Sequence, residues 1–344
     1  MRRPILALAL LLAAAPFARA QSVADFYRGK TIRLIIGAAV GGGYDIPGRV
    51  VASHMARHVP GNPAMVVENM PGATSLIMTN YLFVRAPRDG TAIGMPNNSV
   101  PFEPQLKILS REGGNVAFDL AKFSWIGSPL QEPQALFVMS AAARTIDDLR
   151  ARKTIVASTG TSADNYVMPY MLNQLAGTKM DFVTGYQGQG DIFLALERGE
   201  AHANSAGVSN FFVTKPDWLR DGRVAALVQF GDARLPELKD VPTAMEIAPD
   251  PASREALRFF AQKFKMARPL VLPPDVPADR VAALREAFVA TMKDPAFLAE
   301  AKKTGLEINP VTGPQIEAIL ASIFSASPDV VERLRDLLAR AGGR

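Results

Sequence analysis

The chain has 344 residues, no cysteine, and 38 lysines and arginines against 33 aspartates and glutamates, a formal charge of +5. Without cysteine it has neither a disulfide framework nor a cysteine-linked lipid anchor. Three of the arginines lie in the first 20 residues, so the remainder carries an excess of only two positive charges. This argues against a nucleic-acid-binding surface, which needs clustered cations.

The N-terminus has the layout of a secretory signal peptide. Arg2 and Arg3 precede an apolar run over residues 5–15, and Ala18-Arg19-Ala20 supplies the small residues of a cleavage site. We expect cleavage after Ala20 and a periplasmic location. The apolar run is shorter than the about 20 residues of a spanning helix, so we expect no membrane-embedded segment. The remaining 324 residues are more than a single hydrophobic core usually supports. This length predicts two lobes with a ligand between them.

Short apolar runs, often β-branched, alternate with helical patterns along the chain. The predicted strands cover residues 31–36, 65–68, 92–95, 136–139, 154–157, 181–184 and 224–230. This alternation predicts an α/β fold in which each lobe is a mainly parallel sheet flanked by helices. The C-terminal part is helical, with Val281, Leu284, Phe288 and Met292 on one face and a last helix over 329–340.

Breaks in the pattern suggest how the chain divides. Residues 101–122 lose their periodicity, and two prolines interrupt the stretch 235–242. We therefore expect a first lobe over 21–127, a second lobe over 128–240, and a return to the first lobe over 241–344.

A glycine-rich turn between the first predicted strand and the next helix is the strongest candidate for a binding loop. It holds Ala39, Val40, Gly41, Gly42, Gly43, Tyr44 and Asp45. Residues without a Cβ let backbone N–H groups approach a small anion, and the start of the helix adds its positive end. Asp45 can cap that helix or contact a ligand amine or hydroxyl, and both roles stay open.

Three further strand-to-helix turns repeat this design. The second contains Gly72, Ala73 and Thr74, where Thr74 or Ser75 can cap the next helix or contact a ligand. The third sets Ser158, Thr159, Thr161 and Ser162 beside Gly160, and the fourth contains Gly185, Tyr186 and Asp191. Such turns gather at the carboxyl ends of strands in an open α/β sheet. We therefore expect an anion, a carboxylate or a phosphate, to bridge the two lobes.

Other chemistries are poorly supported. His54 and His58 lie one helical turn apart but lack a third metal ligand. Ser205 is the best hydroxyl for an exported hydrolase or isomerase, yet no base is identified and no Gly-x-Ser-x-Gly turn is present. The glycines also lack the G-x-G-x-x-G spacing of a nicotinamide site. We expect no catalytic residue, no metal and no cofactor.

An ordered set of short segments resembles one family. The segments are Gly41-Gly42-Gly43-Tyr44-Asp45, Asn69-Met70-Pro71-Gly72-Ala73, Ala86-Pro87-Arg88-Asp89-Gly90-Thr91, Ser158-Thr159-Gly160, Gly185-Tyr186 and Val241-Pro242-Thr243. Together they resemble the solute receptors of tripartite tricarboxylate transporters, also called Bordetella uptake gene (Bug) receptors. The resemblance implies a two-lobed, type II periplasmic-binding-protein-like fold that closes on a small organic carboxylate. It implies a non-catalytic receptor, a monomer, that serves a membrane transporter or a sensor.

The resemblance also implies which residues bind the acid. Residues 39–45 and 158–162 would hold it, and Gly72, Ala73, Gly185 and Tyr186 would line the cleft, with Thr74 and Asp191 nearby. Two departures bear on the ligand. Residues 37–40 replace the proline-containing pair found in many relatives, and Tyr44 stands where threonine is commoner. Tyr44 would narrow the pocket or stack on a flat ligand.

Overall fold

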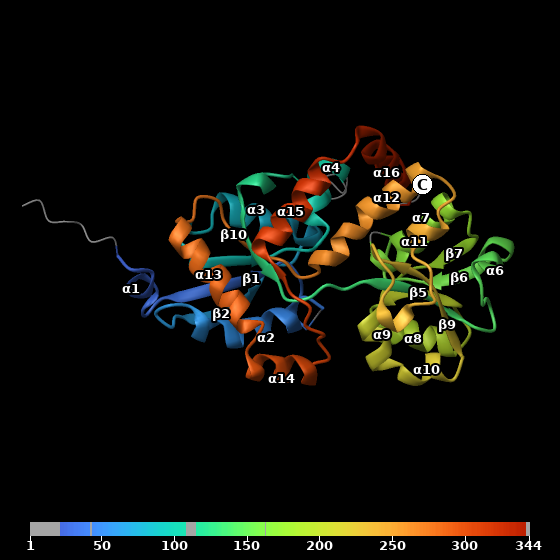
Figure 1. Ribbon diagram of the computed structural model, residues 1–344, viewed down its shortest axis with the longest axis horizontal. Coiled ribbons are helices and arrows are strands. Elements are labelled where there is room, and N and C mark those ends of the chain that lie inside the picture. The colour runs from blue at the N-terminus through green and yellow to red at the C-terminus, as the bar shows by residue number, and fades with distance from the viewer. Residues whose placement is uncertain (1–20, 42, 108–114, 162, 342–344) are drawn as a thin grey trace, which may run out of the picture.

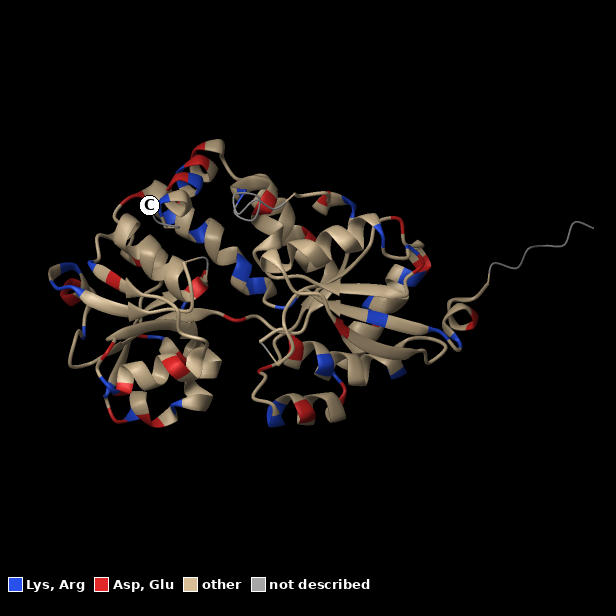
Figure 2. Cartoon of the chain, turned by 180° about the vertical axis from the view of Figure 1, so that it is seen from behind, with Lys and Arg blue, Asp and Glu red and all other residues tan. Residues whose placement is uncertain are grey.

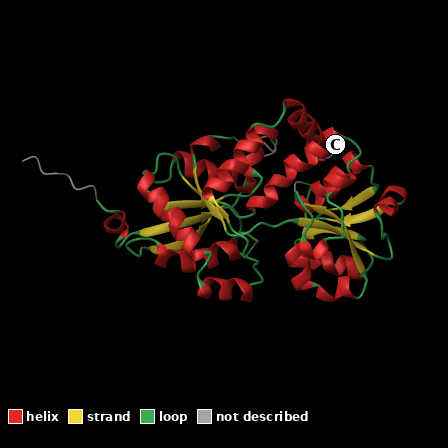
Figure 3. Cartoon of the chain, in the orientation of Figure 1, coloured by secondary structure: helices red, strands yellow, loops and turns green. Residues whose placement is uncertain are grey.

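The computed structural model describes residues 21–41, 43–107, 115–161 and 163–341 of the chain. Two lobes lie side by side, and helices cover both faces of the sheet in each lobe (Figures 1 and 3). The expected signal peptide, Gly42 and Ser162 fall outside the described residues. Within these ranges we find no helix with the length and apolarity that a membrane crossing requires.

The first lobe is built on a six-stranded sheet with the order β11-β4-β10-β3-β1-β2. β1 pairs in parallel with β2 and β3, whereas β10 and β11 pair antiparallel to their neighbours. The strands are β1 (Thr31–Ile36), β2 (Ala64–Asn69), β3 (Ala92–Met95), β4 (Ser124–Ser128), β10 (Leu270–Leu272) and β11 (Val311–Thr312). The helices of this lobe are α1 (Val23–Tyr27), α2 (Asp45–Met55), α3 (Leu76–Val84), α4 (Glu103–Leu106), α13 (Ala278–Thr291), α14 (Pro295–Lys303) and α15 (Gly313–Phe324).

The second lobe is built on a five-stranded sheet with the order β7-β6-β8-β5-β9. β6 pairs in parallel with β7 and β8, and β5 is antiparallel to β8 and β9. The strands are β5 (Gln134–Met139), β6 (Thr154–Ala157), β7 (Met180–Val183), β8 (Ala203–Gly207) and β9 (Val224–Phe230). The helices are α6 (Ile146–Ala151), α7 (Asp164–Ala176), α8 (Gln189–Glu197), α9 (Val208–Thr214), α10 (Pro216–Arg220) and α11 (Ala244–Ile247).

Two helices connect the lobes at the top of Figure 1. α12 (Pro251–Ala261) packs against α11 and α7 of the second lobe and leads the chain back to the first. α16 (Pro328–Ala341) packs against α12, and it touches α7 of the second lobe and α4 of the first. The lobes therefore share a helical bridge in addition to the segments that cross between the sheets.

The expected α/β class and two-lobed architecture are confirmed, but the sheets are mixed. The parallel pairing that the sequence predicts holds among β1, β2 and β3 and among β6, β7 and β8, and the other strand pairings are antiparallel. β4, β8, β10 and β11 were not predicted. β8 consists of small residues, Ala203 to Gly207, without β-branched side chains, yet all five are buried in the middle of the sheet.

The crossings between the sheets can be placed from strand membership. The first crossing runs over residues 129–133, between β4 and β5, just after the expected boundary at 127/128. The return is later than residue 241, because Thr243 still bridges to Gln229 of β9 and α11 packs on that strand. The chain rejoins the first sheet at β10, so the returning segment is 262–269.

Charged residues of both signs are interspersed over both lobes (Figure 2). Many of them form ion pairs between neighbouring turns, such as Arg150 with Asp147 and Arg220 with Asp217. This distribution agrees with the small charge excess of the sequence and with the absence of a polycationic tract.

Candidate ligand-binding site

The carboxylate of Asp45 organises the glycine turn that follows β1. Its Oδ2 atom accepts hydrogen bonds from the Gly41 amide at 2.8 Å and from Arg49 Nε at 2.9 Å. Its Oδ1 atom accepts a bond from Asn69 Nδ2 at 2.9 Å, and the same amide nitrogen donates to the Ala38 carbonyl. Asp45 is only 2% exposed. The Arg49 guanidinium, outweighing the opposing effect of burial, lowers the pKa of Asp45 to about 2.

The Asp45 carboxylate does not cap α2, which is one of the two roles that the sequence left open for it. Tyr44 is the N-cap of α2, it makes no side-chain capping bond, and Asp45 is the first helical residue. The Asp45 carboxylate turns back to hold the loop instead of the helix N–H groups. The Gly41 amide is therefore hydrogen-bonded within the protein and is not free to bind a ligand. Ala39, Val40 and Gly43 are exposed.

Ser75 joins the three loops that follow β1, β2 and β3. Its hydroxyl donates to the Gly37 carbonyl at 2.8 Å and accepts from the Asn97 amide at 3.0 Å. Ser75 is buried and makes no capping bond to α3, so its role is to tie loops together. Gly37 is required for this approach, because a Cβ there would lie 2.3 Å from Ser75 Oγ.

The second turn has an unusual backbone. Gly72 has φ +133°, and Ala73, Thr74 and Ser75 all have left-handed φ values of +43°, +50° and +71°. Such conformations cost about 1–2 kcal/mol each for residues with a Cβ. These strained residues lie where the loops after β1, β2 and β3 meet. Backbone strain of this kind is often found at binding sites.

Tyr44 and Arg268 form a wall between the first loop and the returning segment. The Arg268 guanidinium lies 4.3 Å from the centre of the Tyr44 ring, donates from Nε to the Gly43 carbonyl at 2.6 Å, and pairs with Glu132 at 2.9 Å. The Tyr44 hydroxyl accepts the Asn98 amide at 3.0 Å. Burial raises the pKa of Tyr44 to about 12 against the effect of Arg268, and the carboxylates of Asp164 and Glu132 add to the rise.

The third turn, between β6 and α7, leaves donors unused. Ser158 is fully buried, and its hydroxyl has no hydrogen-bond partner within the described part of the chain. The Thr159 amide donates to Asn165 Oδ1 at 3.2 Å. Ala163 is the N-cap of α7 and provides no side-chain cap. The start of a 13-residue helix therefore presents uncapped N–H groups beside a free hydroxyl.

The fourth turn is more exposed. Gly185 has φ +103°, and Tyr186 packs partly against the apolar cluster under α8. Asp191 lies in the first turn of α8, where it accepts the Gln187 amide at 3.3 Å. These contacts give Asp191 a local role in shaping the turn.

The structure brings the loops of both lobes together around residues that the sequence did not single out. Lys263, in the returning segment, bonds Ser99 after β3 at 3.1 Å and also pairs with Asp164, the first residue of α7. Asp164 interacts electrostatically with Tyr44 and Arg268. No sequence motif marks Lys263 or Arg268, because their partners lie far away along the chain.

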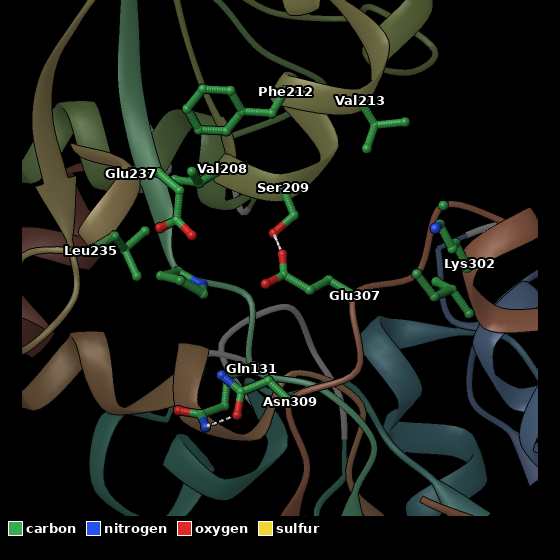
Figure 4. Close-up of a pocket in the computed structure, with 13 residues that line it drawn as sticks. Gln131, Val208, Ser209, Phe212, Val213, Leu235, Glu237, Lys302, Glu307 and Asn309 are labelled. Atoms are coloured by element: carbon green, nitrogen blue, oxygen red, sulfur yellow. Dashed lines mark hydrogen bonds between the residues drawn. The ribbon is translucent and has the colours of Figure 1, made fainter. Parts of the chain in front are cut away.

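A separate cavity of about 480 Å³ lies between the lobes beside the first crossing (Figure 4). Ser209 of α9 bonds Glu307 across the lobes at its mouth, and Gln131 bonds Asn309 at 3.1 Å. Gln131 and Pro133 line this cavity, whereas Glu132 between them pairs with Arg268. None of the candidate ligand residues lines it.

The residues considered for other chemistries have structural partners. His54 and His58 bond Glu300 and Asp294, which ties α2 and the following turn to the α14 region. The described residues contain no group of three or more potential metal ligands. Ser205 lies within β8 and donates to Gln134 at 3.1 Å, while His202 accepts the Ile155 amide.

Comparisons with known proteins agree with this architecture. Residues 48–334 match the family described as "Tripartite tricarboxylate transporter family receptor". The chain is 24% identical over 336 residues to the "UPF0065 protein in gbd 5'region" of Cupriavidus necator, covering 95% of this chain and 93% of that protein.

Two solved structures illustrate the shared fold. A TctC solute-binding protein from Polaromonas has a TM-score of 0.68 and 17% identity, covering 91% of this chain and 99% of that one. An R. palustris protein solved with adipate has a TM-score of 0.61 and 17% identity, covering 91% and 97%. At these identities the likenesses show the fold, and the family match covers most of the chain. The protein belongs to the tripartite tricarboxylate transporter receptor family, whose members bind solutes and are not enzymes.

Proposed function

We propose that the protein is a periplasmic receptor that captures a small organic carboxylate between its lobes and delivers it to a tripartite tricarboxylate-type membrane transporter. The observation that carries this proposal is the uncapped start of α7 beside the buried, partnerless Ser158 hydroxyl. Both are neutral donors that suit a carboxylate. Adipate, found in a relative of the same fold, belongs to this ligand class.

The two lobes contribute differently to the proposed site. The second lobe provides the Ser158 hydroxyl and the first turn of α7, with Gly160 and Thr161 in the same turn and Gly185 and Tyr186 alongside. The first lobe provides the exposed backbone of Ala39, Val40 and Gly43, with Gly72, Ala73 and Thr74 alongside and the Tyr44 ring as a wall. Closure of the lobes would exclude water from the carboxylate while these donors replace it, and the closed shape would be read by the transporter.

Isothermal titration tests this proposal. The protein is unfolded, dialysed and refolded to remove retained ligand, and then titrated with acetate, benzoate, succinate, malate and adipate. We expect saturable binding of at least one acid, accompanied by a smaller radius of gyration in X-ray scattering. A refolded protein that binds none of these acids, nor any acid of a wider panel, would contradict the proposal.

The proposed location has its own test. N-terminal sequencing of protein released from the periplasm by osmotic shock is expected to begin at Gln21, as cleavage after Ala20 requires. Recovery of the full-length chain in the cytoplasmic fraction alone would rule out export.

A further inference from the structure

Lys263 is one of the most deeply buried cations of the described chain. It lies in the 3-10 helix Gln262–Met266 at the start of the returning segment, and its side chain is 3% exposed. Its ammonium bonds Ser99 of the first lobe and Asp164 of the second, and lies 4.8 Å from the centre of the Phe260 ring. One side chain therefore reaches the loops of both lobes at the point where they meet.

Asp164 sits in an unfavourable place for an anion receptor. It is the first residue of α7, immediately after the turn that we propose to hold the ligand carboxylate. A carboxylate at this position favours the helix dipole when it is alone. A second anion bound at the same helix start would be repelled by it, because two like charges would lie close together at a partly buried position.

We propose that Lys263 neutralises Asp164, so that the start of α7 can accept an anionic ligand. This inference rests on the proposed function. The neighbouring charges are also balanced, since Arg268 pairs with Glu132 beside Tyr44. These two ion pairs together carry no net charge, and on this proposal the affinity for an acid depends on how each pair is kept neutral.

Single and double substitutions separate this role from a purely structural one. Lys263→Met leaves Asp164 as an uncompensated negative charge, and we expect it to weaken acid binding by about tenfold or more. Asp164→Asn leaves Lys263 as an uncompensated positive charge, and we expect it to tighten binding by a few-fold. The double variant is expected to return to within about threefold of the wild type, because the charges cancel again.

A matched control is available on the same segment. Lys265 pairs with Asp232, and both side chains are about one-third exposed. Lys265→Met and Asp232→Asn break an ion pair of the same composition away from the α7 start, and we expect acid affinity to stay within about twofold. Titrations use adipate, and also the tightest-binding acid of the panel above if that is a different one, at two salt concentrations.

The outcomes are distinct. Opposite shifts for the two single variants, cancelled in the double variant, support charge neutralisation. If both single variants weaken binding, or neither changes it, while circular dichroism and thermal unfolding show folded protein, Lys263 does not act in this way. A wild-type protein that binds no acid overturns the proposed function, and this inference falls with it.

Discussion

The two glycine turns that end β1 and β6 differ in where their polar groups are satisfied. In the first turn, Asp45 takes the Gly41 amide, Ser75 takes the Gly37 carbonyl, and Arg268 takes the Gly43 carbonyl. In the turn after β6, the Ser158 hydroxyl has no partner and the N-terminal N–H groups of α7 have no side-chain cap within the described residues. The turn after β1 is thus fixed before a ligand arrives, whereas the turn after β6, in which Asn165 holds the Thr159 amide, keeps the Ser158 hydroxyl and the α7 N-terminus available. Such a division lowers the ordering cost of binding while preserving donors for recognition.

The largest expected difference between the two turns is the loss of unfolding free energy when a glycine is replaced by alanine. Gly37→Ala would place a Cβ 2.3 Å from Ser75 Oγ and 2.4 Å from Ser75 Cβ, breaking the junction of three loops. We expect a loss of about 3 kcal/mol in the free energy of unfolding, measured by urea denaturation.

Gly160→Ala is the matched substitution in the turn after β6. Its Cβ would meet no atom of the described residues within 4 Å, and its backbone is outside the left-handed region. We expect a change within about 0.5 kcal/mol. Equal losses at Gly37 and Gly160 would show that the two turns do not differ in packing.

A smaller difference is expected from acid titration of the first turn. The folded-state pKa of Asp45, about 2, lies below the unfolded value of about 4. Its contribution, about 2 kcal/mol, is therefore present above pH 4 and is lost as the pH falls towards 2. Asp45→Asn should lower the free energy of unfolding at pH 7, and the gap to the wild type should shrink by pH 3.

Asp191→Asn serves as the comparison for that experiment. Asp191 is exposed and accepts a single 3.3 Å bond from the Gln187 amide in the second lobe. We expect its replacement to change the unfolding free energy by less than about 0.5 kcal/mol at either pH. A pH-independent deficit for Asp45→Asn would mean that the carboxylate acts by shape and not by charge.

The regular part of the fold could be predicted from the sequence. Runs such as Thr31–Ile36, Ala92–Met95 and Val224–Phe230 are apolar and partly β-branched, and they form β1, β3 and β9 with the expected bounds. β8 could not be predicted in this way, since its small residues owe their strand conformation to neighbours on both sides in the sheet. The return crossing was placed too early because the prolines around residue 240 mark a turn inside the second lobe.

The candidate site was predictable only where it is local. The strand-to-helix turns are contiguous in sequence, so their glycines and hydroxyls stand out. Lys263 and Arg268 pair with Asp164 and Glu132, which lie about a hundred residues or more away, and nothing local distinguishes them from surface cations. For Asp45, the sequence identified the residue but not its hydrogen-bond partner. That partner, the Gly41 amide, depends on the exact path of the loop.

The smallest expected change in stability gives the most direct test of the free Ser158 hydroxyl in the turn after β6. Thr154 is the first residue of β6 and Ser158 directly follows the strand, and both have buried hydroxyls without a partner in the described residues. Removing either should leave the unfolding free energy unchanged or slightly raised, because an unsatisfied hydroxyl is removed. Ser158→Ala should nevertheless weaken acid binding by about tenfold, since a hydroxyl bond to a carboxylate is lost. Thr154→Val should not, because Thr154 starts the strand about 13 Å from the turn. If the two variants bind the acid equally, the Ser158 hydroxyl is a packing defect and not a ligand donor.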